Sequence, residues 1–183
     1  EMNAAADNPI FIAEDNDFLT GGNFHGQSVA AALDFLAIPM TTIGGLAERH
    51  INRLLNPALS GLPDFLTESK GLNSGLMVAQ YTATALASEN KVYAHPASVD
   101  SIPVSADQED YVSMGPAAAY KLRMIQKNVG SILAIQMMCA AQAMDFRPLL
   151  KPGRGTGTAH REIRKRVPHL GDDRVLYPDI DIL

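Results

Sequence analysis

A polar segment, residues 88–115, gathers side chains that can do acid–base or ligand-binding chemistry. It reads SENKVYAHPASVDSIPVSADQEDYVSMG and separates two apolar segments with helical patterns. A plain connector between two helices would be shorter. We therefore expect the segment to face a pocket, and its ionisable candidates are Glu89, His95, Asp100, Asp107, Glu109 and Asp110.

Glu109 permits two interpretations. Residues 105–108 (SADQ) fit a capping box, which predicts a long helix from about Gln108 with Glu109 in its first turn. An acid is common there because the helix dipole is positive at that end. Alternatively, Glu109 points into a pocket and accepts a hydrogen bond from an N–H donor such as an imidazole.

Asn8 and Phe24 allow a structural and a functional interpretation as well. Asn8 precedes Pro9 and can stabilise its own turn, or its amide can hold a substrate carboxylate. Phe24 follows two glycines just before a predicted helix. It is either a core side chain or a ring presented to a small ligand.

The histidines give no metal-ligand spacing, and neither HExxH nor a cysteine pair occurs, so we expect no metal site. The glycine-rich residues 153–157 lack the Gly-Lys-Ser/Thr of a phosphate loop, and we interpret residues 148–158 as a linker. The histidines considered are His25, His50, His95, His160 and His169.

The apolar pattern predicts the elements that would position these side chains. We expect a β-hairpin over residues 10–20, an N-cap at Asn23, and helices over about 25–56 (with Pro39 inside), 73–91, 108–145 and 160–167. The predicted fold is mainly α, a long-helix bundle with a short N-terminal β-hairpin. Its parts are a turn and hairpin (1–22), a helical core (23–145) and a C-terminal loop with a short helix (146–183).

The longest predicted helix has a seam of apolar residues three and four apart, and residues 132–144 are apolar almost all round. Such a helix needs cover on every side, so we expect it to pack against other chains or a missing part of the same protein. The seam residues are Ala118, Leu122, Ile125, Val129 and Ile132.

Length, charge and cysteine content limit the kind of protein that this chain can be. The 183 residues suffice for one domain, and a net charge of −5 argues against nucleic acid or an anionic membrane as partner. The one cysteine, Cys139, predicts a reduced thiol and a cytoplasmic protein. We see no apolar run as long as a membrane span. The chain opens in mid-pattern at Glu1, so we expect it to be a piece of something longer.

Six stretches, in order along nearly the whole chain, resemble the aromatic amino acid ammonia-lyase family, most closely its histidine ammonia-lyases. They are residues 3–9 (NAAADNP), 21–26 (GGNFHG), 71–75 (GLNSG), 88–91 (SENK), 94–103 (AHPASVDSIP) and 108–115 (QEDYVSMG). The resemblance implies the C-terminal portion of a mainly helical homotetramer, with active sites assembled from several subunits. It also implies elimination of ammonia from L-histidine to give urocanate, in histidine degradation.

The resemblance also implies roles for single residues. Asn8 would help bind the substrate carboxylate, Phe24 would line the pocket, and Glu109 would engage the substrate imidazole, where phenylalanine-directed relatives usually have glutamine. Met77 would lie at the far end of the pocket. The electrophile of the family is 4-methylideneimidazol-5-one (MIO), formed from an internal Ala-Ser-Gly, and no external cofactor is needed.

Two departures keep alternatives open. No Ala-Ser-Gly occurs in the chain, so the resemblance implies that MIO forms outside it, in an N-terminal remainder of the enzyme, and that the isolated chain is inactive. Tyr111 stands where histidine-specific members usually have histidine. The alternatives are a tyrosine or phenylalanine ammonia-lyase or 2,3-aminomutase, and a non-catalytic helical assembly module.

Overall fold

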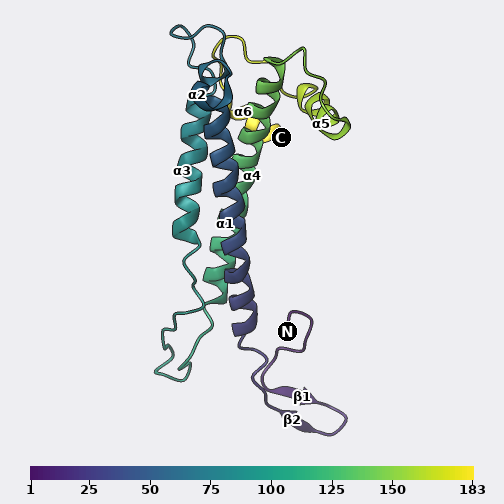
Figure 1. Cartoon of the computed structure of the whole chain (residues 1–183). Coiled ribbons are helices and arrows are strands. Elements are labelled where there is room, and N and C mark those ends of the chain that lie inside the picture. The colour runs from purple at the N-terminus through teal and green to yellow at the C-terminus, as the bar shows by residue number, and fades with distance from the viewer. The chain divides into compact units, whose positions relative to one another are not determined.

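The computed structural model describes all residues from Glu1 to Leu183, and it is mainly helical, as predicted (Figure 1). Contacts divide the chain into two compact units, residues 1–39 with 92–125 and residues 40–91 with 126–183. The elements are β1 (Ile10–Ile12), β2 (Asp17–Leu19), α1 (Gln27–Leu55), α2 (Pro57–Ser60), the 3-10 turn η1 (Asp64–Leu66), α3 (Met77–Tyr93), α4 (Gly115–Asp145), α5 (Arg154–Arg164) and α6 (Tyr177–Ile182).

The predicted hairpin is confirmed in the first unit. β1 and β2 pair antiparallel with Phe11 opposite Phe18, and the two rings lie 5.0 Å apart between centroids. An aromatic cross-strand pair of this kind stabilises a two-stranded ribbon. Both rings are more than half exposed, so the hairpin has no core of its own within the chain.

The first long helix is confirmed, but its predicted N-cap is wrong. α1 begins at Gln27, and the side-chain amide of Asn23 instead donates to the carbonyl of Ala5 at 3.4 Å. The chain thus uses Asn23 to tie the residues before the hairpin to those after it. Pro39 lies inside α1, as expected.

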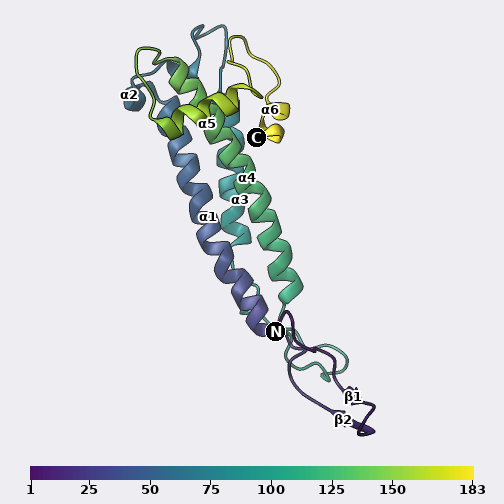
Figure 2. The same ribbon diagram turned by 90° about the vertical axis from the view of Figure 1, so that its right-hand side faces the viewer.

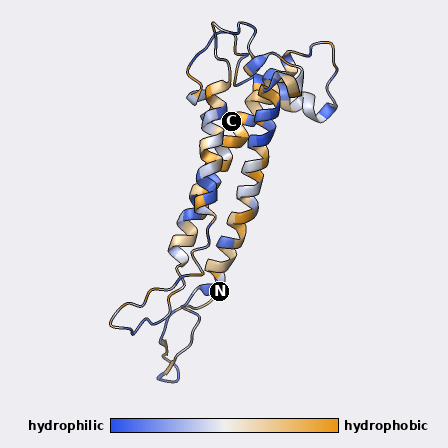
Figure 3. Ribbon diagram, turned by 60° about the vertical axis from the view of Figure 1, so that its left-hand side comes forward, coloured by the Kyte–Doolittle hydropathy of each residue, from blue (hydrophilic) through white to orange (hydrophobic).

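α1 also corrects one expectation from composition. By length and hydropathy alone this helix could cross a membrane, although we saw no apolar run of that length. One such helix is weak evidence, because core helices of soluble proteins pass the same test. Figure 3 shows hydrophobic segments along the long helices. The exposed apolar residues of α1 are Phe35, Leu36, Ile38, Ile43 and Leu46.

The predicted start of the longest helix is wrong by seven residues, although its end at Asp145 is confirmed. Val104 and Glu109 pair in an antiparallel bridge, and the three residues between them that begin at Ser105 have φ of 55°, 55° and 64°. A left-handed backbone cannot belong to an α-helix, so the pattern at residues 105–108 closes a tight turn instead of capping a helix. Helix α4 begins at Gly115.

The second unit holds the main hydrophobic core. The apolar residues of α1, α3 and α4 that face it include Ile51, Ala83, Ile132 and Ile135, each 0% exposed. The chain therefore covers by itself most of the apolar helix segment that we expected other polypeptide to cover. Leu133 and Met137 stay 36% exposed. Of the predicted seam, Ala118, Ile125, Val129 and Ile132 are buried and Leu122 is half-buried.

The C-terminal segment, residues 146–183, packs against the end of α4 (Figure 2). The buried amide of Gln142 bonds the backbone of Leu66 and Leu170 and the guanidinium of Arg164. Helix α5 begins at Arg154, earlier than predicted, so part of the glycine-rich run is helix and not linker. Gly157 permits this because a Cβ there would lie only 3.2 Å from Pro152.

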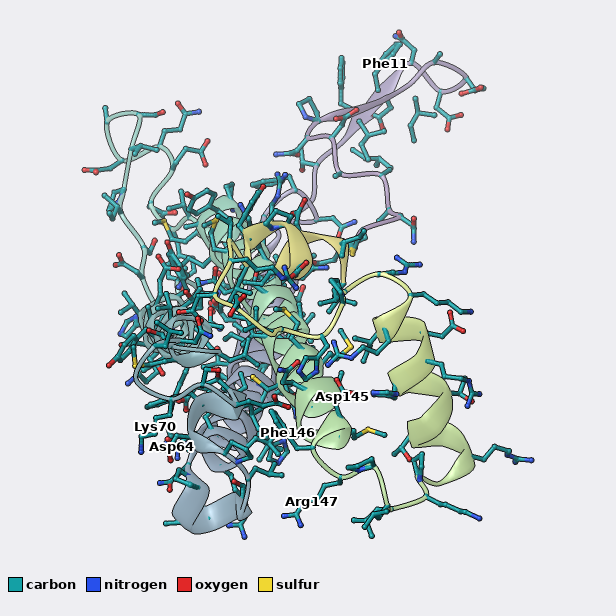
Figure 4. The ribbon with its side chains drawn as sticks, turned by 90° about the horizontal axis from the view of Figure 1, so that it is seen from above. Phe11, Asp64, Lys70, Asp145, Phe146 and Arg147 are labelled. Carbon is teal, nitrogen blue, oxygen red and sulfur yellow. The ribbon has the colours of Figure 1, made fainter.

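Asp145 fastens this segment to the last turn of α4 (Figure 4). Its carboxylate accepts hydrogen bonds from His160 Nε2 at 2.7 Å, Arg164 Nη2 at 2.6 Å and His169 Nδ1 at 2.8 Å. Burial alone would raise the pKa of the Asp145 carboxyl, but these three bonds outweigh it and hold the pKa below its ordinary value. Figure 4 also shows Asp64 and Lys70, which form an ion pair on the same unit.

Candidate functional site

The backbone of Glu109 is fixed although its side chain is exposed. Its N–H donates to the carbonyl of Val104 at 3.3 Å and its carbonyl accepts from Val104 N–H at 3.1 Å. The carboxylate makes no hydrogen bond or ion pair within the chain. An exposed acid on a fixed loop can accept hydrogen bonds from a ligand or a neighbouring polypeptide without first giving up a partner.

The loop that carries Glu109 is tied to α1 and α4 by a buried polar network in the first unit. Asp34, 4% exposed, accepts a hydrogen bond from Ser98 N–H at 2.7 Å. Gln27 Nε2 donates to the Ser98 carbonyl at 3.0 Å, so both backbone groups of Ser98 are held. Lys121 lies 3.9 Å from Asp34 and donates to the carbonyl of His95.

The ionisable candidates of the polar segment do not all lie on this loop. Residues 88–93, which include Glu89, belong to helix α3, and the Glu89 carboxylate accepts from Asn128 at 2.6 Å. Asp100 bonds the N–H of Ser101 at 2.9 Å. Asp107 and Asp110 are exposed as well, but of the acids on this loop only Glu109 has both its backbone N–H and its carbonyl hydrogen-bonded.

Phe24 lies just before α1, and its ring is 50% exposed. The next residue, His25, joins this stretch to the Glu109 loop. His25 Nε2 lies 2.8 Å from the carbonyl oxygen of Tyr111, and the two rings stack with centroids 5.6 Å apart and planes 14° apart. The structure thus places the Phe24 and Glu109 stretches side by side in one unit.

Asn8 is hydrogen-bonded to the stretch that carries Phe24. Its side-chain oxygen accepts from the N–H of Gly21 at 3.2 Å, which holds the base of the hairpin. Its Nδ2 donates to no atom of the chain and is exposed. This bond reaches 13 residues along the chain and is not the bond within its own turn that we considered for Asn8. The amide hydrogens of Asn8 remain available to an acceptor such as a carboxylate.

Three of the four predicted site residues therefore share one hydrogen-bonded assembly. Residues 5–8, 21–25 and 109–111 are linked by the bonds of Asn8, Asn23 and His25. Met77 belongs to the second unit, where it is half-buried at the first residue of α3. No motif in the sequence singles out Asp34 or Lys121, and the histidine pattern tests His25 only as a metal ligand.

Cys139 cannot serve as a nucleophile in this fold. It is a free cysteine with 0% exposure, and burial raises the pKa of its thiol to about 12. A thiol that stays protonated and inaccessible is a packing residue. The chemistry of the chain therefore lies with its exposed polar groups.

Comparison with known proteins assigns this arrangement to a family. The profile of the aromatic amino acid lyases matches residues 1–165. The chain belongs to the aromatic amino acid lyase family. It is 57% identical over 183 residues to the histidine ammonia-lyase of Symbiobacterium thermophilum, covering 100% of this chain and 36% of that protein. This family member thus spans about a third of the length of the curated relatives that it matches.

Solved structures of the family have the same fold. Histidine ammonia-lyase from Trypanosoma cruzi superposes with a TM-score of 0.92 at 47% identity, over 99% of this chain and 36% of that one. Tyrosine aminomutase from Streptomyces globisporus superposes with a TM-score of 0.89 at 44% identity, over 98% of this chain and 34% of that one. A histidine ammonia-lyase and a tyrosine aminomutase thus share the fold of this chain.

Proposed function

We propose that residues 1–183 supply the C-terminal portion of a histidine ammonia-lyase, which eliminates ammonia from L-histidine to give urocanate. The observation that carries the proposal is the hydrogen-bonded assembly that sets Asn8, Phe24 and the unpartnered Glu109 in one unit. The 57% identity to a histidine ammonia-lyase supports it. In this role the chain acts in the cytoplasm and assembles with the N-terminal remainder of the enzyme as a homotetramer.

Each group then has a task that its chemistry suits. The amide hydrogens of Asn8 donate to the carboxylate of the amino acid, and the exposed ring of Phe24 lines the pocket. The Glu109 carboxylate accepts a hydrogen bond from the N–H of the imidazole. Holding the substrate at both ends fixes the β-carbon relative to the reacting groups, which lowers the entropic part of the barrier.

The electrophile MIO would come from polypeptide outside this chain. No Ala-Ser-Gly occurs in residues 1–183, and the donor set present, an amide, a ring and a carboxylate, fits binding of the substrate. When present, MIO supplies the electrophilic carbon that activates the amino group for departure. The isolated chain should accordingly form no urocanate.

Exposed apolar side chains support assembly with other polypeptide. Leu36 and Ile43, seven residues apart and therefore on one side of α1, are 49% and 51% exposed, and Phe35 is 74% exposed. Large apolar side chains that stay exposed on a helix are typical of surfaces that other polypeptide covers. A tetramer in which subunits complete one another's active sites would cover it.

The substitution Glu109→Gln in the full-length enzyme tests the proposal. It keeps the size of the side chain and removes the charge, so a charge-assisted hydrogen bond to the imidazole becomes a neutral one. We expect kcat/KM for histidine to fall about 10- to 100-fold. The matched control is Glu14→Gln in the exposed hairpin turn, which should leave the rate unchanged, and an unchanged rate for Glu109→Gln would contradict the proposal.

A competing function draws on the likeness to tyrosine aminomutase at 44% identity. A phenol also has a hydrogen to donate to a carboxylate, so Glu109 alone does not exclude tyrosine. Phenylalanine has no such donor and would leave the carboxylate unpaired. The relative rates on the three amino acids decide between these functions.

A further inference from the structure

His25 contacts Tyr111, a residue far along the chain, through both its ring and its Nε2 atom. The residue lies before the first turn of α1, and its ring packs flat on Tyr111 at 5.6 Å between centroids. Its Nε2 is 2.8 Å from the Tyr111 carbonyl oxygen. Because a carbonyl only accepts, Nε2 must carry the proton, and both the neutral Nε2–H tautomer and the imidazolium satisfy the bond.

The residues joined by this contact flank the two sides of the proposed pocket. Phe24 immediately precedes His25, and Glu109 lies two residues before Tyr111. The two backbone segments also lie close together at Gly26 and Ser113. A Cβ placed on Gly26 would lie 3.8 Å from Ser113 Oγ. The ring and the carboxylate are therefore held on two backbone segments that meet at His25.

No other side chain joins these segments by a hydrogen bond. The bonds that shape the Glu109 loop, Val104 with Glu109 and Ser101 with Val112, lie within that loop. Asp34 and Gln27 hold the loop at Ser98, ten residues or more from Glu109. The placement of Glu109 relative to Phe24 thus depends on the bond from His25.

We propose that His25 is a positioning residue that sets the spacing between the Phe24 ring and the Glu109 carboxylate, and hence the fit of the imidazole. The inference rests on the proposed function. In this role His25 acts through the Tyr111 carbonyl, which its Nε2 binds at 2.8 Å, and not on substrate. A misplacement of about 1 Å at a binding group can reduce a rate by up to about 100-fold.

Two substitutions separate the hydrogen bond from the ring. His25→Phe keeps a flat ring for stacking and has no donor. His25→Gln loses the ring and carries an amide nitrogen at nearly the position of the imidazole Nε2. In the full-length enzyme we expect His25→Phe to lower kcat/KM for histidine about 10-fold and His25→Gln to restore most of it, with both melting temperatures near that of the wild type.

A double-mutant cycle shows whether His25 acts through Glu109. In the Glu109→Gln background, His25→Phe should have little further effect, since the carboxylate that it positions is already lost. His50→Phe, the same change at a histidine of the second unit that bonds Gln136, is the matched control and should leave kcat/KM unchanged.

The outcomes distinguish the two proposals. If the wild type does not turn over histidine, the proposed function fails and this inference fails with it. If the wild type is active and His25→Phe equals it, or its effect adds in full to that of Glu109→Gln, only this inference is overturned. It is also overturned if both His25 variants lose activity in proportion to a lower melting temperature, because His25 would then only stabilise the fold.

Discussion

The two units of the chain differ in how far their side chains are buried. In residues 40–91 with 126–183, apolar groups pack in a core and buried polar groups such as Gln142 find partners within the unit. In residues 1–39 with 92–125, the buried polar groups hold a loop in place, while Phe24 and Glu109 remain exposed. Tight packing stabilises the second unit, whereas the first unit leaves an aromatic ring and a carboxylate exposed.

We therefore expect the second unit to determine mainly stability and the first unit to determine mainly activity. Substitutions in the second unit should lower the melting temperature of the full-length protein. Substitutions at Glu109 or His25 should change kinetics and leave the melting temperature near that of the wild type. The predictions for Gly75 and Asp145 concern the second unit, and a failure of either would contradict this separation of stability from activity.

The largest effect is expected at Gly75. Its φ of +57° is left-handed, and a Cβ there would lie 2.5 Å from the carbonyl oxygen of Phe65. Gly75→Ala should therefore cost about 3 kcal/mol of stability and lower the Tm by roughly 5–10 °C, as measured by thermal unfolding.

Gly130→Ala is the matched control for that substitution. Gly130 lies inside α4, where an added Cβ would meet nothing within 4 Å, and alanine favours a helix more than glycine does. Its Tm should equal or exceed that of the wild type. A wild-type Tm for Gly75→Ala would contradict the packing described for residues 65–75.

A smaller, pH-dependent effect is expected at Asp145. The pKa of its carboxyl is lower in the folded state, so the folded protein binds this proton more weakly than the unfolded chain. Its stabilisation is therefore present above the ordinary pKa near 4 and is lost as the pH falls through the folded value. Asp145→Asn should cost about 2 kcal/mol at pH 7.

Thermal unfolding of wild type and Asp145→Asn at several pH values checks this. The difference in Tm should be largest near pH 7 and shrink below about pH 4. Glu162→Gln, at an exposed acid paired with Lys165, should change the Tm by less than about 1 °C. A difference for Asp145→Asn that stayed constant or grew towards acid pH would show that the carboxylate is not the stabilising species.

Local patterns predicted the elements that local interactions determine. Two short apolar runs on either side of an acidic turn predicted the hairpin, and apolar periodicity predicted α1 and the end of α4. The errors occur where distant residues decide. The start of α3 shifts to Met77 because the Asp173 carboxylate, 98 residues beyond Gly75, binds the N–H groups of Ser74 and Gly75.

The start of α4 was missed for a similar reason. Residues 105–108 match a helix cap in sequence, and the pairing of Val104 with Glu109 turns them into a tight loop. For the site, motif resemblance selected Asn8, Phe24 and Glu109, and the structure places them in one unit. The support from Asp34, Lys121 and His25 could not be read from the sequence, because each bonds a backbone group more than 20 residues away.

Substrate preference tests the central claim most directly. The measurement is kcat/KM of the full-length enzyme on L-histidine, L-tyrosine and L-phenylalanine. If the Glu109 carboxylate accepts a hydrogen bond from the imidazole N–H, histidine should be preferred by at least about 10-fold over tyrosine and about 100-fold over phenylalanine. Equal or faster turnover of tyrosine or phenylalanine would contradict the account.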